Sequence, residues 1–185
     1  MMHLGIDYGA KLAGTTAICW EVEGRLNVSG SKKNQDADAF LMDSIQVLKP
    51  TQIFIDAPLS LPGAYFGKTE DFHFREADRQ VSAMSPMFLG GLTARAMSLR
   101  SNLPDVLFFE TYPRELVRIL DLKEHYKVDP GLFLSELGDR LPYPLDSKSL
   151  DWHQVDAVLA WLSGWRFRND RCKVFGHSGE GMIWV

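Results

Sequence analysis

The sequence predicts an α/β fold built around a mixed sheet, and three observations lead to that class. Three strand-like segments follow one another at the N-terminus with turn residues between them, which is typical of an antiparallel meander. The run Ile53–Ile55 is apolar on both faces, as in a strand that is covered on both sides. Near the C-terminus, Leu150–Arg166 has the apolar spacing of a long helix. The leading meander argues against a regularly alternating, doubly wound sheet.

The meander is expected within residues 3–29. Residues His3–Ile6 alternate weakly and predict the first strand, and Thr15–Val22 predict the second. Glu23 and Gly24 are typical of a hairpin turn and lead into a third strand at Arg25–Ser29. We therefore expect these three strands to pair in sequence order.

A helix and two further strands follow the meander. Asp36–Val47 carries apolar residues at helical spacing, and Pro50 ends the pattern. The buried run Ile53–Ile55 then forms a strand that ends in Asp56. Val106–Glu110 reads VLFFE and predicts a second buried strand that ends in an acid.

Between these two buried strands we expect an insertion over residues 60–91, where aromatic and charged residues are mixed with prolines and glycines. It carries a short helix near Phe74–Val81. Two more helices are expected at Thr93–Ser101 and Pro113–Leu122, the second with proline in its first turn.

The C-terminal part contains the clearest helix of the chain. A linker runs to Leu145, and the helix Leu150–Arg166 follows it. Lys173–Phe175 and Met182–Val185 flank the turn sequence GHSGEG and predict a terminal hairpin. The expected order is three strands, a helix, a strand, the insertion, a helix, a strand, two helices and the hairpin.

Composition limits the classes of function. The 185 residues fit a single domain, 1–185, and carry a formal net charge of −4. This is not the broad basic surface of a protein that coats nucleic acid, so a nucleic-acid contact needs a local basic cluster or a metal ion. Two cysteines without metal-ligand spacing, together with no signal peptide and no long apolar run, predict a cytoplasmic protein without a membrane partner.

Three acids end apolar strands. Asp7 closes the first strand, Asp56 the fourth and Glu110 the fifth. Ligands collect at strand ends in open α/β sheets, so these acids are expected to meet if their strands are neighbours. One such acid alone is typical of a turn or helix cap, but three in succession favour a shared site.

The long helix adds a fourth acid. Asp156 lies between Val155 and Ala157 on an apolar surface, where a carboxylate needs a partner or a metal because burying an unpaired charge is costly. His153 lies three residues earlier and shares its helix face. The alternative for His153 is an ordinary surface or hydrogen-bonded histidine.

Clustered carboxylates favour a divalent metal. Mg²⁺ and Mn²⁺ prefer oxygen ligands, and two such ions about 4 Å apart activate water and stabilise the leaving oxygen of a phosphodiester. The sequence has no GxSxG, HExxH, Walker or GxGxxG motif. Metal-dependent phosphoryl chemistry is therefore favoured over acyl transfer.

With these acids in this order, the chain resembles the RNase H-like superfamily, whose fold is a five-stranded mixed sheet in βββαβαβα order. More narrowly, it resembles the predicted nucleases of domain-of-unknown-function family 429, which are related to resolvases of the RuvC type. The segments that carry the resemblance extend over nearly the whole chain. They are GIDYGAKLAGTTA, FIDAPLSLP, READRQ, SPMFLGG, FFETYPRELVRIL and WHQVDAVLAWLSGWR, with the terminal hairpin.

The resemblance implies roles for particular residues. Asp7, Asp56 and Asp156 become the metal-binding acids of the first strand, the fourth strand and the last helix, and His153 stands one turn before Asp156. Glu110 matches a further family acid of less defined role. The turn after Asp7 departs from the family, because Tyr8 and Lys11 replace its commoner Asp-Gly form.

Basic residues supply candidate substrate contacts. Lys11, Arg75, Arg79 and Arg95 are expected near the rim of the site, where arginine binds phosphate through two parallel hydrogen bonds. The alternatives are salt bridges between the arginines and nearby acids, and a Lys11 that points into water.

The sequence leaves three functional hypotheses. The first is a Mg²⁺- or Mn²⁺-dependent nuclease that acts on DNA or RNA by a two-metal type of mechanism, with Asp7, Asp56, His153 and Asp156 as its catalytic residues. The second is a small ATPase or kinase-like module, based on the turn after Asp7, although the chain length fits only one of the two domains such proteins use. The third is a non-catalytic RNase H-like binding protein. Substrate and oligomeric state are left open.

Overall fold

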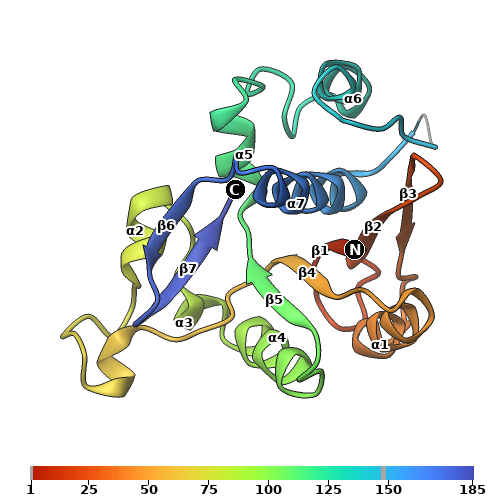
Figure 1. The fold of residues 1–185 in the computed structure, drawn as a ribbon. Coiled ribbons are helices and arrows are strands. Elements are labelled where there is room, and N and C mark those ends of the chain that lie inside the picture. The colour runs from red at the N-terminus through yellow and green to blue at the C-terminus, as the bar shows by residue number, and fades with distance from the viewer. Residues whose placement is uncertain (1, 147–148) are drawn as a thin grey trace.

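The computed structural model describes residues 2–146 and 149–185, and within them it shows a mixed sheet of seven strands between two layers of helices (Figure 1). The strands lie in the order β3-β2-β1-β4-β5-β7-β6. In chain order they are β1 (His3–Asp7), β2 (Ala17–Val22), β3 (Arg25–Gly30), β4 (Gln52–Asp56), β5 (Leu107–Glu110), β6 (Val174–His177) and β7 (Gly181–Trp184). The helices are α1 (Ala37–Leu48), α2 (Glu76–Val81), α3 (Pro86–Leu89), α4 (Gly91–Ser101), α5 (Pro113–Ile119), α6 (Pro130–Gly138) and α7 (Trp152–Arg168), with a 3₁₀ turn η1 (Gly63–Phe66).

The predicted meander and the predicted buried strands are confirmed. β1 pairs with β2, and β2 with β3, in antiparallel register, while β1 pairs with β4, and β4 with β5, in parallel. The sheet is therefore mixed, with its parallel strands at the centre. Burial on both faces explains why Ile53–Ile55 has no polar alternation.

The expected five-stranded sheet with a separate terminal hairpin is wrong in one respect. β6 and β7 form the hairpin, but β7 also pairs in parallel with β5 through Glu110 and Ile183, so the hairpin extends the sheet to seven strands. The pairing covers the backbone of β5, which would otherwise be an open edge. Sequence spacing showed the hairpin but not the strand that receives it.

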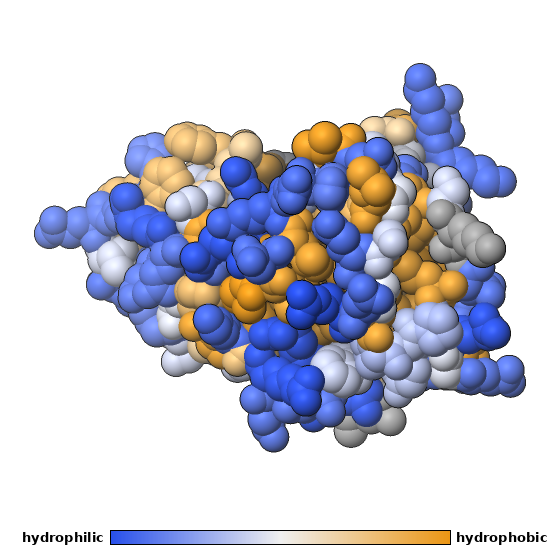
Figure 2. Space-filling model, turned by 90° about the horizontal axis from the view of Figure 1, so that it is seen from above, coloured by the Kyte–Doolittle hydropathy of each residue, from blue (hydrophilic) through white to orange (hydrophobic). Residues whose placement is uncertain are grey.

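Helices cover both faces of the sheet. α7 lies across β1, β2 and β4 with α5 and α6 beside it, and α1 and α4 lie on the opposite side (Figure 1). From the side of α6 and α7, hydrophilic side chains cover much of the surface, with hydrophobic ones between them towards the middle (Figure 2). On the α1 side, buried residues of the strands and helices form one core: Leu4, Ile6, Ile18, Ile53, Ile55, Leu41, Ile45, Ala96 and Leu99.

Two glycines let α7 approach the sheet closely. A Cβ added to Gly5 of β1 would lie 2.1 Å from the backbone nitrogen of Trp161, and one added to Gly164 would lie 2.5 Å from the ring of His3. Any side chain at Gly5 would push the helix backbone away. The contact holds the middle of α7 against β1 and so fixes how far the N-terminal part of the helix lies from the end of that strand.

Several predicted helices have different bounds. α2 begins at Glu76 instead of Phe74, and α7 runs Trp152–Arg168 instead of Leu150–Arg166. The stretch described above as a linker contains α6, whose first turn has Asp129 as N-cap and Pro130 at its start. The sequence contains this start signal, but the helix is short. Its apolar residues could be recognised as a core face only from their packing in the same core as α7.

The predicted insertion contains η1, α2 and α3, and α2 packs against β6. Glu180, in the turn of the hairpin, is buried and accepts hydrogen bonds from the backbone N–H groups of Gly63 at 2.5 Å and Glu76 at 2.9 Å. The insertion and the terminal hairpin therefore support each other. No helix in the described ranges is long and apolar enough to cross a membrane.

Candidate metal centre

The register of two parallel strands places the first two acids side by side. Asp7 and Asp56 are direct partners at the ends of β1 and β4. Side chains of paired residues point to the same face of a sheet, so both carboxylates face the same side. That side carries α7, because Gly5, two residues before Asp7, lies under this helix.

The third acid comes from α7. Asp151 caps the helix by accepting a hydrogen bond from the N–H of Gln154 at 2.9 Å, and the close contact at Gly5 fixes the distance between helix and strand. Asp156 is thereby buried beside the two strand ends. Asp7, Asp56 and Asp156, here called the metal-site acids, each offer one oxygen within 4.8 Å of the others.

Protein groups bind two of the metal-site acids and leave the third without a hydrogen bond. His153 Nδ1 lies 2.7 Å from Asp7 Oδ2. The Tyr126 hydroxyl donates to Asp156 Oδ1 at 2.8 Å, and the Lys127 ammonium forms an ion pair with Asp156 Oδ2. In residues 2–146 and 149–185, no group donates a hydrogen bond to the carboxylate of Asp56.

Burial makes this group of carboxylates hard to ionise. Burial raises the pKa of Asp7 to about 6. The hydrogen bond from His153 opposes this shift, and repulsion by Asp156 adds to it. Burial and then repulsion by Asp7 and Asp156 raise the pKa of Asp56 well above its usual range. The pKa of Asp156 is also raised by burial, although Lys127 opposes the shift.

The donor set fits a hard divalent cation. Three carboxylate oxygens within a few ångströms are the ligands that Mg²⁺ and Mn²⁺ prefer. The carboxylate of Asp56 has no protein donor among the described residues, and a cation would supply the charge that its surroundings lack. The residues therefore fit the metal that the sequence predicts.

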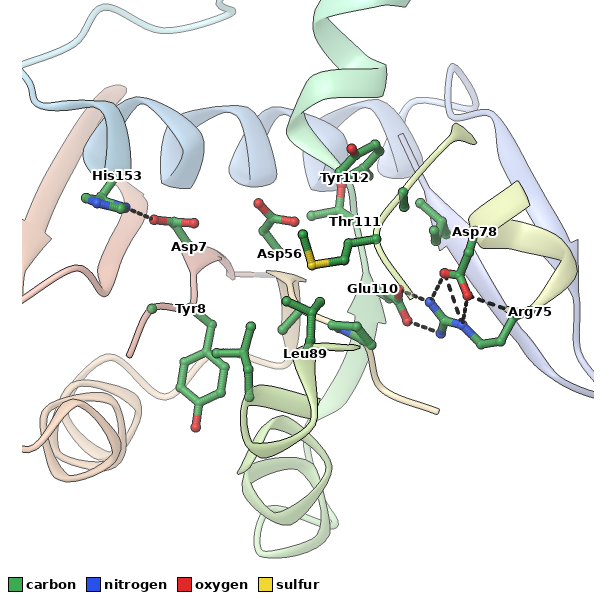
Figure 3. Close-up of a pocket in the computed structure, with 17 residues that line it drawn as sticks. Asp7, Tyr8, Asp56, Arg75, Asp78, Leu89, Glu110, Thr111, Tyr112 and His153 are labelled. Atoms are coloured by element: carbon green, nitrogen blue, oxygen red, sulfur yellow. Dashed lines mark hydrogen bonds and ion pairs between the residues drawn. The ribbon is translucent and has the colours of Figure 1, made fainter. Parts of the chain in front are cut away.

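Two of the metal-site acids, Asp7 and Asp56, line a pocket of about 370 Å³ (Figure 3). Asp7 and His153 line one end, and Glu110 and Arg75 lie at the other. Figure 3 shows Asp56 between these two ends, below α7. A substrate group that reaches the acids therefore has open space beside it.

Glu110 does not join the metal-site acids. It pairs with Ile55 of β4 and not with Asp56, so its side chain points to the opposite face of the sheet. Its carboxylate binds Arg75 through two hydrogen bonds of 2.6 and 2.7 Å and accepts a third from the N–H of Leu59 at 2.9 Å.

Arg75 is enclosed by acids. It is 0% exposed, and its guanidinium bonds Asp78 as well as Glu110 and donates to the Ser60 hydroxyl at 2.8 Å. These contacts engage all its N–H donors. Arg75, Asp78 and Glu110, here called the arginine cluster, form a closed ion-pair network, so we leave Arg75 out of the proposed substrate contacts.

The other predicted basic contacts also have acidic partners. Arg79 pairs with Asp71 on the surface. Lys11 lies 3.2 Å from Asp36. The salt-bridge alternative for the arginines is thus present in the structure.

Arg95 and Tyr8 explain the unusual turn after Asp7. Arg95 binds Asp38 at 2.6 Å and lies 4.6 Å over the ring of Tyr8, whose hydroxyl donates to the same Asp38. Tyr8 is therefore a buried anchor between β1, α1 and α4. Substrate contacts by Lys11, Arg79 and Arg95 stay predictions.

The backbone of that turn is already hydrogen-bonded. The N–H of Gly9 donates to the hydroxyl of Thr16 at 3.0 Å, and that of Ala10 donates to the hydroxyl of Thr15 at 3.2 Å. A phosphate-binding turn needs such N–H groups free to face the anion. The arrangement does not favour the ATPase or kinase-like hypothesis.

The sequence analysis missed Tyr126 and Lys127. Both lie in the stretch taken as a linker, between α5 and α6, and Lys127 adopts a left-handed backbone conformation with φ of 62°. No motif marks them. Their position follows from the packing of Tyr126 against Phe133 of α6 and Trp152 of α7, with ring centroids 5.3 and 5.6 Å apart.

Comparisons with known proteins give no family assignment. No protein-family model matches the sequence, and no curated protein matches it. Among solved structures, RuvC of Thermus thermophilus is similar at 16% identity with a TM-score of 0.49. The same protein in complex with a Holliday junction substrate is similar at 17% identity with a TM-score of 0.47. Each match covers 92% of this chain and 98% of the other. At these TM-scores and identities, the likeness carries no argument about function.

Proposed function

We propose that this protein is a Mg²⁺- or Mn²⁺-dependent nuclease that hydrolyses phosphodiester bonds of DNA or RNA. One observation carries the proposal. The metal-site acids come from two strands and a helix, yet their oxygens lie within 4.8 Å of one another. Such an arrangement is costly unless a cation binds it, because burial already raises the pKa of each carboxyl.

Each residue has a distinct part in the proposal. The metal-site acids would hold the cation, and a bound cation would supply activation of water and stabilisation of charge on the phosphate oxygens. His153 orients Asp7 through Nδ1, while its Nε2 has no hydrogen-bond partner among the described residues and is available to hold a proton of water or substrate. Tyr126 fixes the carboxylate of Asp156.

Lys127 adds a charge that the sequence did not foresee. Its ammonium forms an ion pair with the carboxylate of Asp156, which is one of the proposed metal ligands. Any metal ion at this oxygen requires the lysine to move, because two cations cannot share it without strong repulsion. The two-metal mechanism stays a prediction, and the geometry supports at least one ion held by Asp7 and Asp56.

The alternative of a non-catalytic binding protein has a geometric test. Acids too far apart to share an ion would favour it, whereas one oxygen from each of Asp7, Asp56 and Asp156 lies within 4.8 Å of the others, which supports the nuclease proposal instead. Lys11 and Arg79 each form one ion pair, but their side chains are still 54% and 62% exposed to solvent. We therefore keep them as proposed phosphate contacts.

The test is cleavage of labelled single strands, duplexes, RNA–DNA hybrids and four-way junctions with Mg²⁺, with Mn²⁺ and with chelator. We expect at least one substrate to be cut by the wild type only when metal is present, and not by Asp56→Asn. The matched control is Asp43→Asn, which removes an exposed carboxylate of α1. A wild type that cuts none of these substrates, or an Asp56→Asn variant as active as the wild type, would overturn the proposal.

A further inference from the structure

The pocket beside the metal-site acids has a second, apolar part that metal chemistry does not use. Met84, Leu89 and Leu92 line it from one side, and Pro58 and Tyr112 line it as well. Metal binding and water activation need carboxylates and a histidine, but no thioether, aliphatic wall or phenol ring. This wall therefore calls for a separate explanation.

The apolar wall comes largely from one segment of the insertion. Met84 lies just before α3, Leu89 ends α3, and Leu92 is in the first turn of α4. Met84 is 59% exposed at the mouth of a charged site. Exposure of a large apolar side chain to water is unfavourable, so such a position indicates a surface that packs on a ligand. An exposed, flexible methionine beside a pocket is typical of a surface that packs on a flat or variable ligand.

We propose that this wall, formed by Met84, Leu89, Leu92 and Tyr112, binds a single unpaired nucleobase of the strand whose phosphate faces the metal-site acids. The inference rests on the proposed nuclease function and deepens it. A phosphate and its own base belong to one nucleotide, so a phosphate at Asp7 and Asp56 brings a base within reach of the adjoining wall. Every base has a flat π-face that stacks on an aromatic ring such as that of Tyr112 and packs against apolar side chains.

The size of the pocket limits the occupant. About 370 Å³ is near the lower end for small-molecule sites and has room for one nucleoside-sized group. A base inside a duplex is held by its neighbours and must first be unstacked. The pocket therefore favours single-stranded, looped or junction substrates, where an unpaired base is already available.

A neighbouring aromatic surface offers the sharpest alternative. Phe88 is 68% exposed, with its ring centroid 5.8 Å from that of His73 and 6.0 Å from that of Phe74. Phe88 does not line the pocket, whereas the adjacent Leu89 does. One α3 helix thus presents two different candidate stacking positions, and single substitutions separate them.

The test measures binding of a short single strand that carries the fluorescent base 2-aminopurine. Ca²⁺ replaces Mg²⁺, because it takes the same oxygen ligands in a looser geometry. We expect the wild type to change the fluorescence on binding, and Met84→Ala and Leu89→Ala to weaken binding by about fivefold or more. The same strand held in a full duplex should bind more weakly. Val47→Ala, an exposed apolar change on α1, is the matched control.

The outcomes distinguish the base site from the nuclease activity. Wild-type affinity in both pocket variants, a wild type that does not bind the strand, or a loss on Phe88→Ala alone, would overturn the base site. Cleavage of the same strand in Mn²⁺ by wild type and by Asp56→Asn is measured in parallel. Metal-dependent cleavage with unchanged binding by the pocket variants rejects the base site only, whereas absent cleavage with weakened binding rejects the nuclease and leaves the base site in place.

Discussion

Two buried groups of carboxylates lie at the same end of the sheet, and they are neutralised in different ways. The arginine cluster is complete within the protein, because Arg75 bonds both of its acids and is itself 0% exposed. The metal-site acids have only partial partners, with His153 on one, Tyr126 and Lys127 on another, and no hydrogen-bond donor among the described residues on Asp56.

The difference separates acids that are paired within the fold from acids that are available to bind a cation. Burial raises the pKa of Glu110 as well, but the hydrogen bonds and the charge of Arg75 oppose that shift. Burial likewise opposes the charge of Arg75, and Glu110 and Asp78 raise its pKa, so each charge in this network has a partner inside the protein. Burial and mutual repulsion instead raise the pKa of Asp7 and Asp56. A closed network stabilises the fold, whereas an open one is available to bind a cation. The following changes test that contrast, from the largest expected effect to the smallest.

Asp56→Asn should abolish metal-dependent cleavage, with a rate at least roughly 10³-fold lower, because the ion loses a charged ligand worth several kcal/mol in the transition state. The metal-free fold should be unharmed or more stable at pH 7.5, since a repelling charge is removed. Cleavage rates and thermal denaturation measure the two effects. A large loss of stability in Asp56→Asn would instead place this residue with the structural acids.

Arg75→Met should lower the free energy of unfolding by about 3–5 kcal/mol, because it leaves Glu110 and Asp78 buried without their partner. Urea denaturation at pH 7.5 measures the change. Cleavage by the fraction that remains folded should be affected much less than in Asp56→Asn. A stability equal to that of the wild type would show that the arginine cluster is not the closed network described here.

The metal-free protein should lose stability as the pH rises from 5 to 7.5. The folded pKa of Asp7, about 6, lies above the ordinary carboxyl value, so the folded state holds its proton more tightly and this contribution falls as the pH passes from about 4 to 6. The raised pKa of His153 acts in the same direction above pH 6.5, because its stabilisation is lost as the pH rises through the folded pKa.

Thermal denaturation of wild type and Asp7→Asn isolates this effect. We expect the Tm of the wild type, measured relative to the variant, to fall by about 5 °C between pH 5 and 7.5 in chelator. Mg²⁺ should restore it at pH 7.5 and act weakly at pH 5, where protons compete with the ion. A Mg²⁺ response of equal size in Asp7→Asn would contradict metal binding at this residue.

Lys127→Ala should tighten Mn²⁺ binding by about tenfold, because the lysine competes with a cation for Asp156 from a half-exposed position. Calorimetric titration of Mn²⁺ gives the affinity and the number of ions. Lys123→Ala, which changes an exposed lysine of the same loop, is the control. Weaker binding in Lys127→Ala would show that the lysine supports the ion instead of displacing it.

Arg79→Met should leave the urea midpoint nearly unchanged, although it removes the same side chain as Arg75→Met from the same helix region. Its partner Asp71 is on the surface, where water solvates both charges and an ion pair contributes little. The comparison of the two arginine variants therefore contrasts a buried ion-pair network with an exposed ion pair. Similar destabilisation in both would contradict the distinction between closed and exposed pairs.

Much of the fold follows from local patterns. The meander, the run Ile53–Ile55 and the long helix were predicted because alternation, two-sided apolarity and helical spacing are properties of neighbouring residues. Helix α6 and the addition of the hairpin to the sheet were missed. Both depend on contacts with distant parts of the chain, with α7 in one case and with β5 in the other.

The sequence also supplied the candidate acids, but not their grouping. Strand-end positions singled out Asp7, Asp56 and Glu110 equally, and only the register of β4 and β5 separates them. A shift of one residue pairs Glu110 with Ile55 and sends it to the face where Arg75 lies. The assignment of these residues to catalysis stays a prediction until cleavage is measured.

By itself, the sequence determined a mixed α/β sheet and a set of acids at strand ends and on the last helix, because these features are set by spacing along the chain. Tertiary structure alone decided that Gly5 lets α7 bring Asp156 to Asp7 and Asp56, that Arg75 closes around Glu110, and that Lys127 reaches the site. The physical reason is that burial and charge pairing depend on which side chains are neighbours in space, and at this site those neighbours are far apart in sequence.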